Sequence, residues 1–141
     1  MKVLALCLSL VGCVFGVTHN DLATIVNMVI ADTDVDMDGF ISEAELANEF
    51  QNRFDANNDG IILKNEFIHG WTTRYGDKHH HTDIFFDNID LNGNGMIDLS
   101  DIEGNKVLTD TDADGMVSVE EYKAFIMAKH PCGDHGLDCT A

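Results

Sequence analysis

Four short segments of this sequence repeat the same spacing of oxygen-bearing side chains around a glycine. Each begins with Asp, has Asp or Asn at its third and fifth positions and Gly at its sixth, and carries an acidic residue at its twelfth. These segments, called loops 1 to 4, span residues 34–45, 55–66, 90–101 and 110–121. Loops 1, 2 and 4 close on Glu, whereas loop 3 closes on Asp101. One such match is a weak signal, but four in 141 residues indicate a repeated binding unit.

The residue types in these loops suit a hard divalent cation. Ca²⁺ takes about six to eight oxygen ligands at about 2.3–2.6 Å, and side-chain oxygens at alternate positions of a tight loop can converge on one point. The glycine allows the loop to bend sharply, because an unusual backbone angle costs it little. The eighth position is β-branched throughout, which favours a short strand there. The residues at this position are Ile41, Ile62, Ile97 and Val117.

The four loops resemble those of the EF-hand calcium-binding superfamily, whose best-known member is calmodulin. The resemblance implies an all-α fold, an EF-hand helix-loop-helix array with short two-stranded bridges between paired loops. It also implies Ca²⁺ as the cofactor, with the seventh residue offering its carbonyl oxygen and the twelfth closing the site. The metal ligands that follow are Asp34, Asp36, Asp38, Phe40, Ser42, Glu45, Asp55, Asn57, Asp59, Ile61, Glu66, Asp90, Asn92, Asn94, Met96, Asp98, Asp101, Asp110, Asp112, Asp114, Met116, Ser118 and Glu121.

The intervals between loops differ from those of calmodulin-like proteins, in which two helices fit between paired loops. Here the loops start 21, 35 and 20 residues apart, so only the central interval has that room, with two helical stretches expected in 67–89. Residues 46–54 and 102–109 can each hold one shared helix, which rises about 1.5 Å per residue and so keeps its two loops too far apart for a strand bridge of about 5 Å. The spacing therefore predicts that loop 2 bridges loop 3 and that loop 1 meets loop 4.

This pairing predicts one nested domain over residues 17–131 with a single core. The aromatic residues expected to share that core are Phe50, Phe54, Trp71, Phe85 and Phe125.

The loops are expected to differ in affinity, because ligand charge tunes calcium binding. Loops 1 and 4 each offer four carboxylates. Loop 2 has Leu63 at its ninth position, which provides no side-chain oxygen. Loop 3 is expected to be the weakest, because Asp101 is one methylene shorter than Glu and favours coordination through one oxygen. That smaller site is expected to tolerate Mg²⁺.

The first 16 residues are expected to form a signal peptide outside the fold. Lys2 precedes an apolar run over 3–11, and the chain continues to Gly16, a small residue suited to cleavage. The apolar run is too short to span a membrane. Residues 10–13 also fit a bacterial lipoprotein box, in which Cys13 would carry the lipid. The two interpretations agree that the protein is exported, and the first predicts secretion.

Two cysteines remain in the C-terminal tail, residues 132–141. An even pair in an exported chain indicates a disulfide between Cys132 and Cys139. The alternative is a metal site that combines cysteine with His130 or His135. The run 79–81 is three consecutive histidines, for which a solvated loop is expected and a Zn²⁺ or Cu²⁺ site is the alternative.

Charge limits the function classes. With 25 acidic and 8 basic residues the net charge is −17, which argues against nucleic acid or an anionic membrane surface as a partner. The loops account for most paired carboxylates and no catalytic motif is found, so no enzyme activity is expected. The favoured function is calcium buffering, transport or storage outside the cell. The alternatives are an acidic matrix or biomineralisation protein with a protein or mineral partner, and a calcium sensor that binds a protein target.

Overall fold

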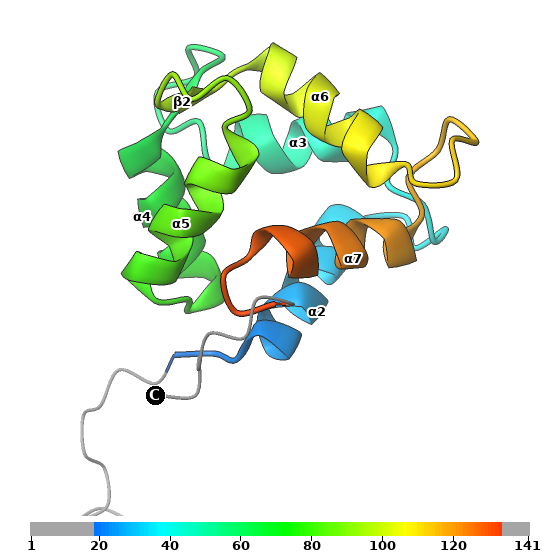
Figure 1. The fold of residues 1–141 in the computed structure, drawn as a ribbon, viewed down its shortest axis with the longest axis horizontal. Helices are drawn as coiled ribbons and strands as arrows, with labels where there is room; N and C mark the ends of the chain where they lie inside the picture. Colours follow the sequence, from blue (N-terminus) through cyan, green and yellow to red (C-terminus); the bar gives the residue numbers. More distant parts are fainter. Residues whose placement is uncertain (1–18, 134–141) are drawn as a thin grey trace, which may run out of the picture.

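Residues 19–133 are described by the computed structural model, so the expected signal peptide, His135 and Cys139 lie outside the described residues. Within this range the chain forms six helices and two short strands (Figure 1). The helices are α2 (Leu22–Thr33), α3 (Glu43–Arg53), α4 (Lys64–Tyr75), α5 (His79–Ile89), α6 (Leu99–Thr109) and α7 (Val119–Lys129), and the strands are β1 (Ile62–Leu63) and β2 (Met96–Ile97). The predicted all-α array with short bridging strands is confirmed.

Each loop continues directly into a helix, because its ninth residue is the N-cap of that helix. Ser42 and Ser118 accept a hydrogen bond from the backbone N–H three residues later, at Glu45 and Glu121. These glutamates bond back to the N-cap backbone, which completes a capping box at each helix start. The loop sequence therefore also specifies where the following helix begins.

Helices α3 and α6 are the shared helices that the short spacing predicts. Helix α3 runs from the end of loop 1 to the start of loop 2, and α6 does the same for loops 3 and 4. The longer central interval holds two helices, α4 and α5, joined by a turn at Gly76 and packed against each other.

The loops pair as predicted from this spacing. Strands β1 and β2 are antiparallel, with Ile62 opposite Ile97, so loop 2 bridges loop 3. At the other end of the molecule the amide of Ile41 donates to the carbonyl of Val117 at 2.7 Å, and the amide of Val119 donates to that of Gly39 at 3.0 Å. Loop 1 therefore meets loop 4, and the pairing is nested.

One hydrophobic core joins residues from both halves of the chain. Phe54, Trp71 and Phe85 are at most 3% exposed, and Phe50 and Phe125 pack partly buried against them. The Trp71 ring lies 4.9 Å from Phe85 and 5.4 Å from Phe67 between ring centroids. The shared core is confirmed, and Phe67 stands at its centre.

The prediction of a solvated loop for the three histidines is wrong. His79 to His81 form the first turn of α5, and the His81 side chain is only 13% exposed. The turn is stabilised by Asp77, which accepts hydrogen bonds from the Lys78 amide at 2.8 Å and from the Thr82 hydroxyl at 3.0 Å. A carboxylate at this place satisfies free donors of the helix N-terminus and favours its positive end.

Asp77 also binds the C-terminal end of the described chain. It is 4% exposed, and His130, which is fully buried, hydrogen-bonds it through Nε2 at 2.9 Å. The Cys132 amide donates to His130 Nδ1 at 3.2 Å, so both ring nitrogens of His130 are engaged and neither faces a metal. Burial acts to raise the pKa of Asp77, but the hydrogen bonds it accepts outweigh that effect and hold the pKa below its ordinary value.

Replacing His130 with Ala should therefore destabilise the fold. The change leaves the buried Asp77 carboxylate without its partner and opens a cavity, so we expect a loss of about 2–4 kcal/mol in the free energy of unfolding. Urea unfolding in calcium-saturated buffer measures it. The control is His80→Ala, at an exposed histidine, for which we expect a change within about 0.5 kcal/mol. Equal unfolding midpoints for the two variants would contradict this role of His130.

Candidate metal centres

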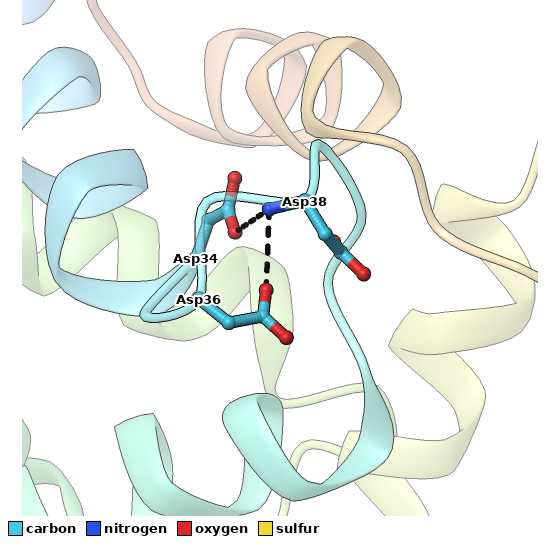
Figure 2. Close-up of side chains that lie close together, drawn as sticks. All are labelled: Asp34, Asp36 and Asp38. Carbon is cyan, nitrogen blue, oxygen red and sulfur yellow. Dashed lines mark hydrogen bonds between the residues drawn. The ribbon is translucent and has the colours of Figure 1, made fainter.

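Loop 1 holds three aspartate side chains around one small volume. Carboxylate oxygens of Asp34, Asp36 and Asp38 lie within 4.8 Å of one another. Figure 2 shows how the backbone keeps them there: the Asp38 amide donates to Asp34 Oδ1 at 3.1 Å and to Asp36 Oδ1 at 3.2 Å. Asp34 is largely buried at the end of α2, whereas the other two are exposed. Several hard oxygens facing one point are the donor set that Ca²⁺ prefers.

The other loops repeat this arrangement. In each, the amide of the fifth residue donates to the side-chain oxygens of the first and third residues, with Asn in place of Asp where the sequence has it. The bonds are Asp59 N to Asp55 Oδ1 (3.2 Å) and Asn57 Oδ1 (2.9 Å), Asn94 N to Asp90 Oδ1 (3.2 Å) and Asn92 Oδ1 (3.0 Å), and Asp114 N to Asp110 Oδ1 (3.2 Å) and Asp112 Oδ1 (3.1 Å). The structure thus brings the expected first, third and fifth residues together in all four loops.

The sixth-position glycine is required by the backbone of the loop. Its φ lies between 83° and 87° in every loop, a left-handed conformation that other residues adopt only with strain. Its amide donates to the second oxygen of the first aspartate. These bonds run from Gly39 to Asp34 (3.2 Å), Gly60 to Asp55 (2.8 Å), Gly95 to Asp90 (2.7 Å) and Gly115 to Asp110 (3.0 Å).

The twelfth residue connects the two halves of its loop. In loop 1, Glu45 Oε1 accepts from the amide of Val35, the second loop residue, at 2.8 Å. Its other oxygen accepts from the amide of Ser42, the N-cap, at 2.9 Å. Glu121 makes the equivalent bonds in loop 4, to Thr111 and Ser118, both at 2.9 Å. The carboxylate expected to close the site therefore already faces the loop interior.

Asp101 reaches the same two places in loop 3 although its side chain is shorter. One oxygen accepts from the Leu91 amide at 2.9 Å and the other from the Asp98 amide at 3.2 Å, and the residue is 1% exposed. The reason lies one turn further along α6, at Gly104. A Cβ there would lie 2.6 Å from the Leu91 side chain, so glycine lets α6 approach the loop closely. The sequence alone marks Gly104 only as a weak helix former, and its role emerges from this packing.

Loop 2 closes differently. Glu66 accepts from the amide of Leu63 at 2.9 Å, and the ninth residue supplies no side-chain cap for α4. Asp55 is 5% exposed, and Asn57 and Asp59 are exposed.

The seventh and ninth residues take the expected places. The seventh-residue amides donate to the fifth side chains, which directs the backbone through the loop. These bonds join Phe40 to Asp38 (2.9 Å), Ile61 to Asp59 (2.9 Å), Met96 to Asn94 (3.0 Å) and Met116 to Asp114 (2.8 Å). Asp98, like Ser42 and Ser118, caps the helix that follows its loop.

Negative charge accumulates in loop 4. Hydrogen bonds from the amide and hydroxyl of Ser118 and from Thr111 hold the pKa of Glu121 at about 2. At Asp112, the bond from the Asp114 amide acts to lower the pKa, but slight desolvation and the charges of neighbouring loop carboxylates outweigh it and raise the pKa. Repulsion of this kind is relieved when a cation binds between the carboxylates.

No loop carboxylate is neutralised by a basic side chain among residues 19–133. The ion pairs of Lys and Arg in this part of the chain go to Asp32, Glu43, Glu49, Asp83 and Asp87, none of which is an expected ligand. The loop oxygens therefore remain for a metal ion, and the residues present fit Ca²⁺.

Within the described residues, no helix is long and apolar enough to cross a membrane.

Comparison with known proteins identifies the loops. A family model described as EF hand matches residues 32–51, 82–103 and 109–127, which contain loops 1, 3 and 4. No curated protein and no solved structure matches the chain. The matched segments coincide with the loops and their flanking helices, and EF hands indicate calcium binding. The chain belongs to the EF-hand calcium-binding superfamily.

Proposed function

We propose that this protein is exported and binds up to four Ca²⁺ ions, acting outside the cell in calcium buffering, transport or storage. The observation that carries the proposal is the recurrence, in all four loops, of the same oxygen arrangement around a left-handed glycine. Export rests on the sequence of the first 16 residues and on the cysteine pair in the tail. EF-hand proteins are typically binding proteins, and we propose no enzymatic reaction.

An acidic matrix protein is the second candidate, and the net charge favours it. Removal of residues 1–16 deletes one lysine and no acid, so the charge of −17 becomes −18. Four Ca²⁺ ions would still leave −10, a surplus that could hold a mineral face or a basic macromolecule. Retention on calcium mineral or on extracellular matrix at physiological salt would favour this candidate over a free buffer.

A calcium sensor is less well supported. The apolar space between α3, α4, α6 and α7 amounts to about 30 Å³, close to the volume of a single water molecule. Met28 and Met127 pack against the core, whereas Met37 and Met116 are exposed in the loops. A sensor would expose an apolar groove with calcium, and a fluorescent apolar probe that brightens on calcium addition would favour that function.

Titration calorimetry tests the proposed stoichiometry. The protein without residues 1–16 should bind three or four Ca²⁺ ions, and Glu45→Gln should remove one site because it deletes the carboxylate that closes loop 1. The control is Glu103→Gln, which makes the same charge change at an exposed position of α6. Fewer than two ions bound by the unaltered protein would overturn the proposal.

Asp101→Glu tests the proposed weakness of loop 3. The longer side chain can offer both oxygens to the ion, so we expect tighter Ca²⁺ binding at loop 3 and weaker competition by Mg²⁺. Competition titrations followed at the Gly95 amide measure both effects. Glu103→Asp, which changes a carboxylate length elsewhere on α6, serves as the control. A weaker site would show instead that the close approach at Gly104 suits Asp101 and leaves no room for Glu.

Mass spectrometry of the exported protein tests its processing. The N-terminus should lie near Val17, and the mass should be two hydrogens below that of the reduced chain because Cys132 and Cys139 form a disulfide. A lipid on Cys13, or free thiols at both tail cysteines, would contradict the proposed route.

A further inference from the structure

The four loops form a closed ring in which shared helices and strand bridges alternate. Helix α3 connects loop 1 to loop 2, and strands β1 and β2 connect loop 2 to loop 3. Helix α6 then connects loop 3 to loop 4, and the hydrogen bond between Ile41 and Val117 returns to loop 1. In Figure 1 the chain can be followed around this circuit, with α3 and α6 along the upper edge. Every loop therefore has two covalent or hydrogen-bonded neighbours.

A shared helix moves both of its loops together. Helix α3 has 11 residues, about 16 Å at about 1.5 Å per residue, and is short enough to move as a rigid rod. Glu45, which closes loop 1, lies in its first turn, and Asp55, the first residue of loop 2, follows its last turn by one residue. A shift of α3 that closes loop 1 therefore also displaces the start of loop 2.

Arg53 ties the starts of the two loops to each other. It lies two residues before Asp55 and donates through Nη2 to the carbonyl of Asp32 at 2.6 Å, two residues before Asp34. Its Nη1 lies 2.9 Å from the Asp32 carboxylate, and its Nε lies 3.0 Å from Glu49. One guanidinium thus connects the end of α2 with the end of α3.

This tie is embedded in the interior. Glu49 is 1% exposed, and the hydroxyl of fully buried Tyr75 donates to it at 2.6 Å. Arg74 adds a second ion pair to Asp32, at 2.6 Å, from the end of α4. Because buried charges are costly to separate, the starts of loops 1 and 2 and the end of α4 hold one arrangement.

Helix α6 has a corresponding tie to loop 3. Asn105 donates through Nδ2 to the carbonyl of Ile89, the residue before Asp90, at 2.7 Å. Gly104 brings the same helix against Leu91 in that loop. An ion pair from Lys106 to Glu43 joins α6 to the first turn of α3. The two shared helices are therefore fixed to their loops and to each other.

We propose that calcium binding is coupled around this ring, with α3 and α6 transmitting binding free energy between loops 1 and 2 and between loops 3 and 4. The inference rests on the proposed function as a calcium-binding protein. Two independent pairs of loops would limit the Hill coefficient to about 2, whereas a coupled ring exceeds it. Arg53 is a positioning residue for this coupling and touches no expected ligand.

The glycine amides provide a separate reporter for each loop. Each sixth-position amide donates to the first aspartate of its own loop, so its NMR resonance follows that site. In the protein without residues 1–16, Glu45→Gln should shift the calcium midpoint at Gly60 in loop 2, as well as at Gly115 in loop 4, by about fivefold or more. An unchanged midpoint at Gly60, together with a Hill coefficient of 2 or less, would overturn ring coupling.

Arg53→Lys tests the route through α3. Lysine keeps a positive charge near Glu49 but lacks the planar fork that reaches Asp32. The Glu45→Gln effect at Gly60 should then fall by more than half, while its effect at Gly115, transmitted through the strand bridge, persists. A merely structural role would weaken both effects equally, and that result would overturn the assignment. Lys123→Arg, at an exposed position of α7, is the control.

Asp32→Asn provides a second variant if Arg53→Lys does not fold. It removes the paired carboxylate and keeps the backbone carbonyl, and it should reduce the effect at Gly60 in the same selective way. The proposed function fails if no glycine amide responds to millimolar Ca²⁺. If all four respond but Gly60 ignores the loss of Glu45, only the coupling fails.

Discussion

The carboxylate at the twelfth loop position holds this fold together. In loops 1, 3 and 4 it binds the N-cap of the following helix with one oxygen and the second residue of its own loop with the other. Loop closure and helix initiation therefore depend on the same side chain. A cation between the loop oxygens would draw on that same carboxylate, so metal binding acts directly on the start of a helix.

The nested architecture follows from this coupling and from chain length. A loop that must lead directly into a helix leaves about 20 residues for one helix and no return, so consecutive loops separate to its two ends. Backbone donors at the loop edges then find partners in the remaining loops, 2 with 3 and 1 with 4. The two bridges bring the halves of the chain together, and Phe54 meets Phe67 and Trp71 in one core.

The parts of the structure that could be predicted are those encoded by local spacing. The loops, the shared helices and the pairing all follow from intervals between aspartates and from helix geometry. The contact of Asp77 with His130 joins residues 53 positions apart, and no periodic pattern announces it. For the same reason the histidine run was expected in a loop, although its turn is fixed by Asp77. Gly104 is a further case, because its value depends on how closely Leu91 packs against α6.

The few basic residues show how the chain reconciles its charge with a folded interior. It has only 8 Lys and Arg against 25 acids, and those that form ion pairs within residues 19–133 join one helix to another. Arg53 and Arg74 hold α3 and α4 to the end of α2, Lys64 holds α4 to α5, and Lys106 holds α6 to α3. Had these cations paired with the loops, they would have neutralised the sites and left the helices unconnected. Their placement stabilises the frame and leaves the loop repulsion unrelieved, so that binding of a divalent cation removes an electrostatic cost that the rest of the protein does not remove.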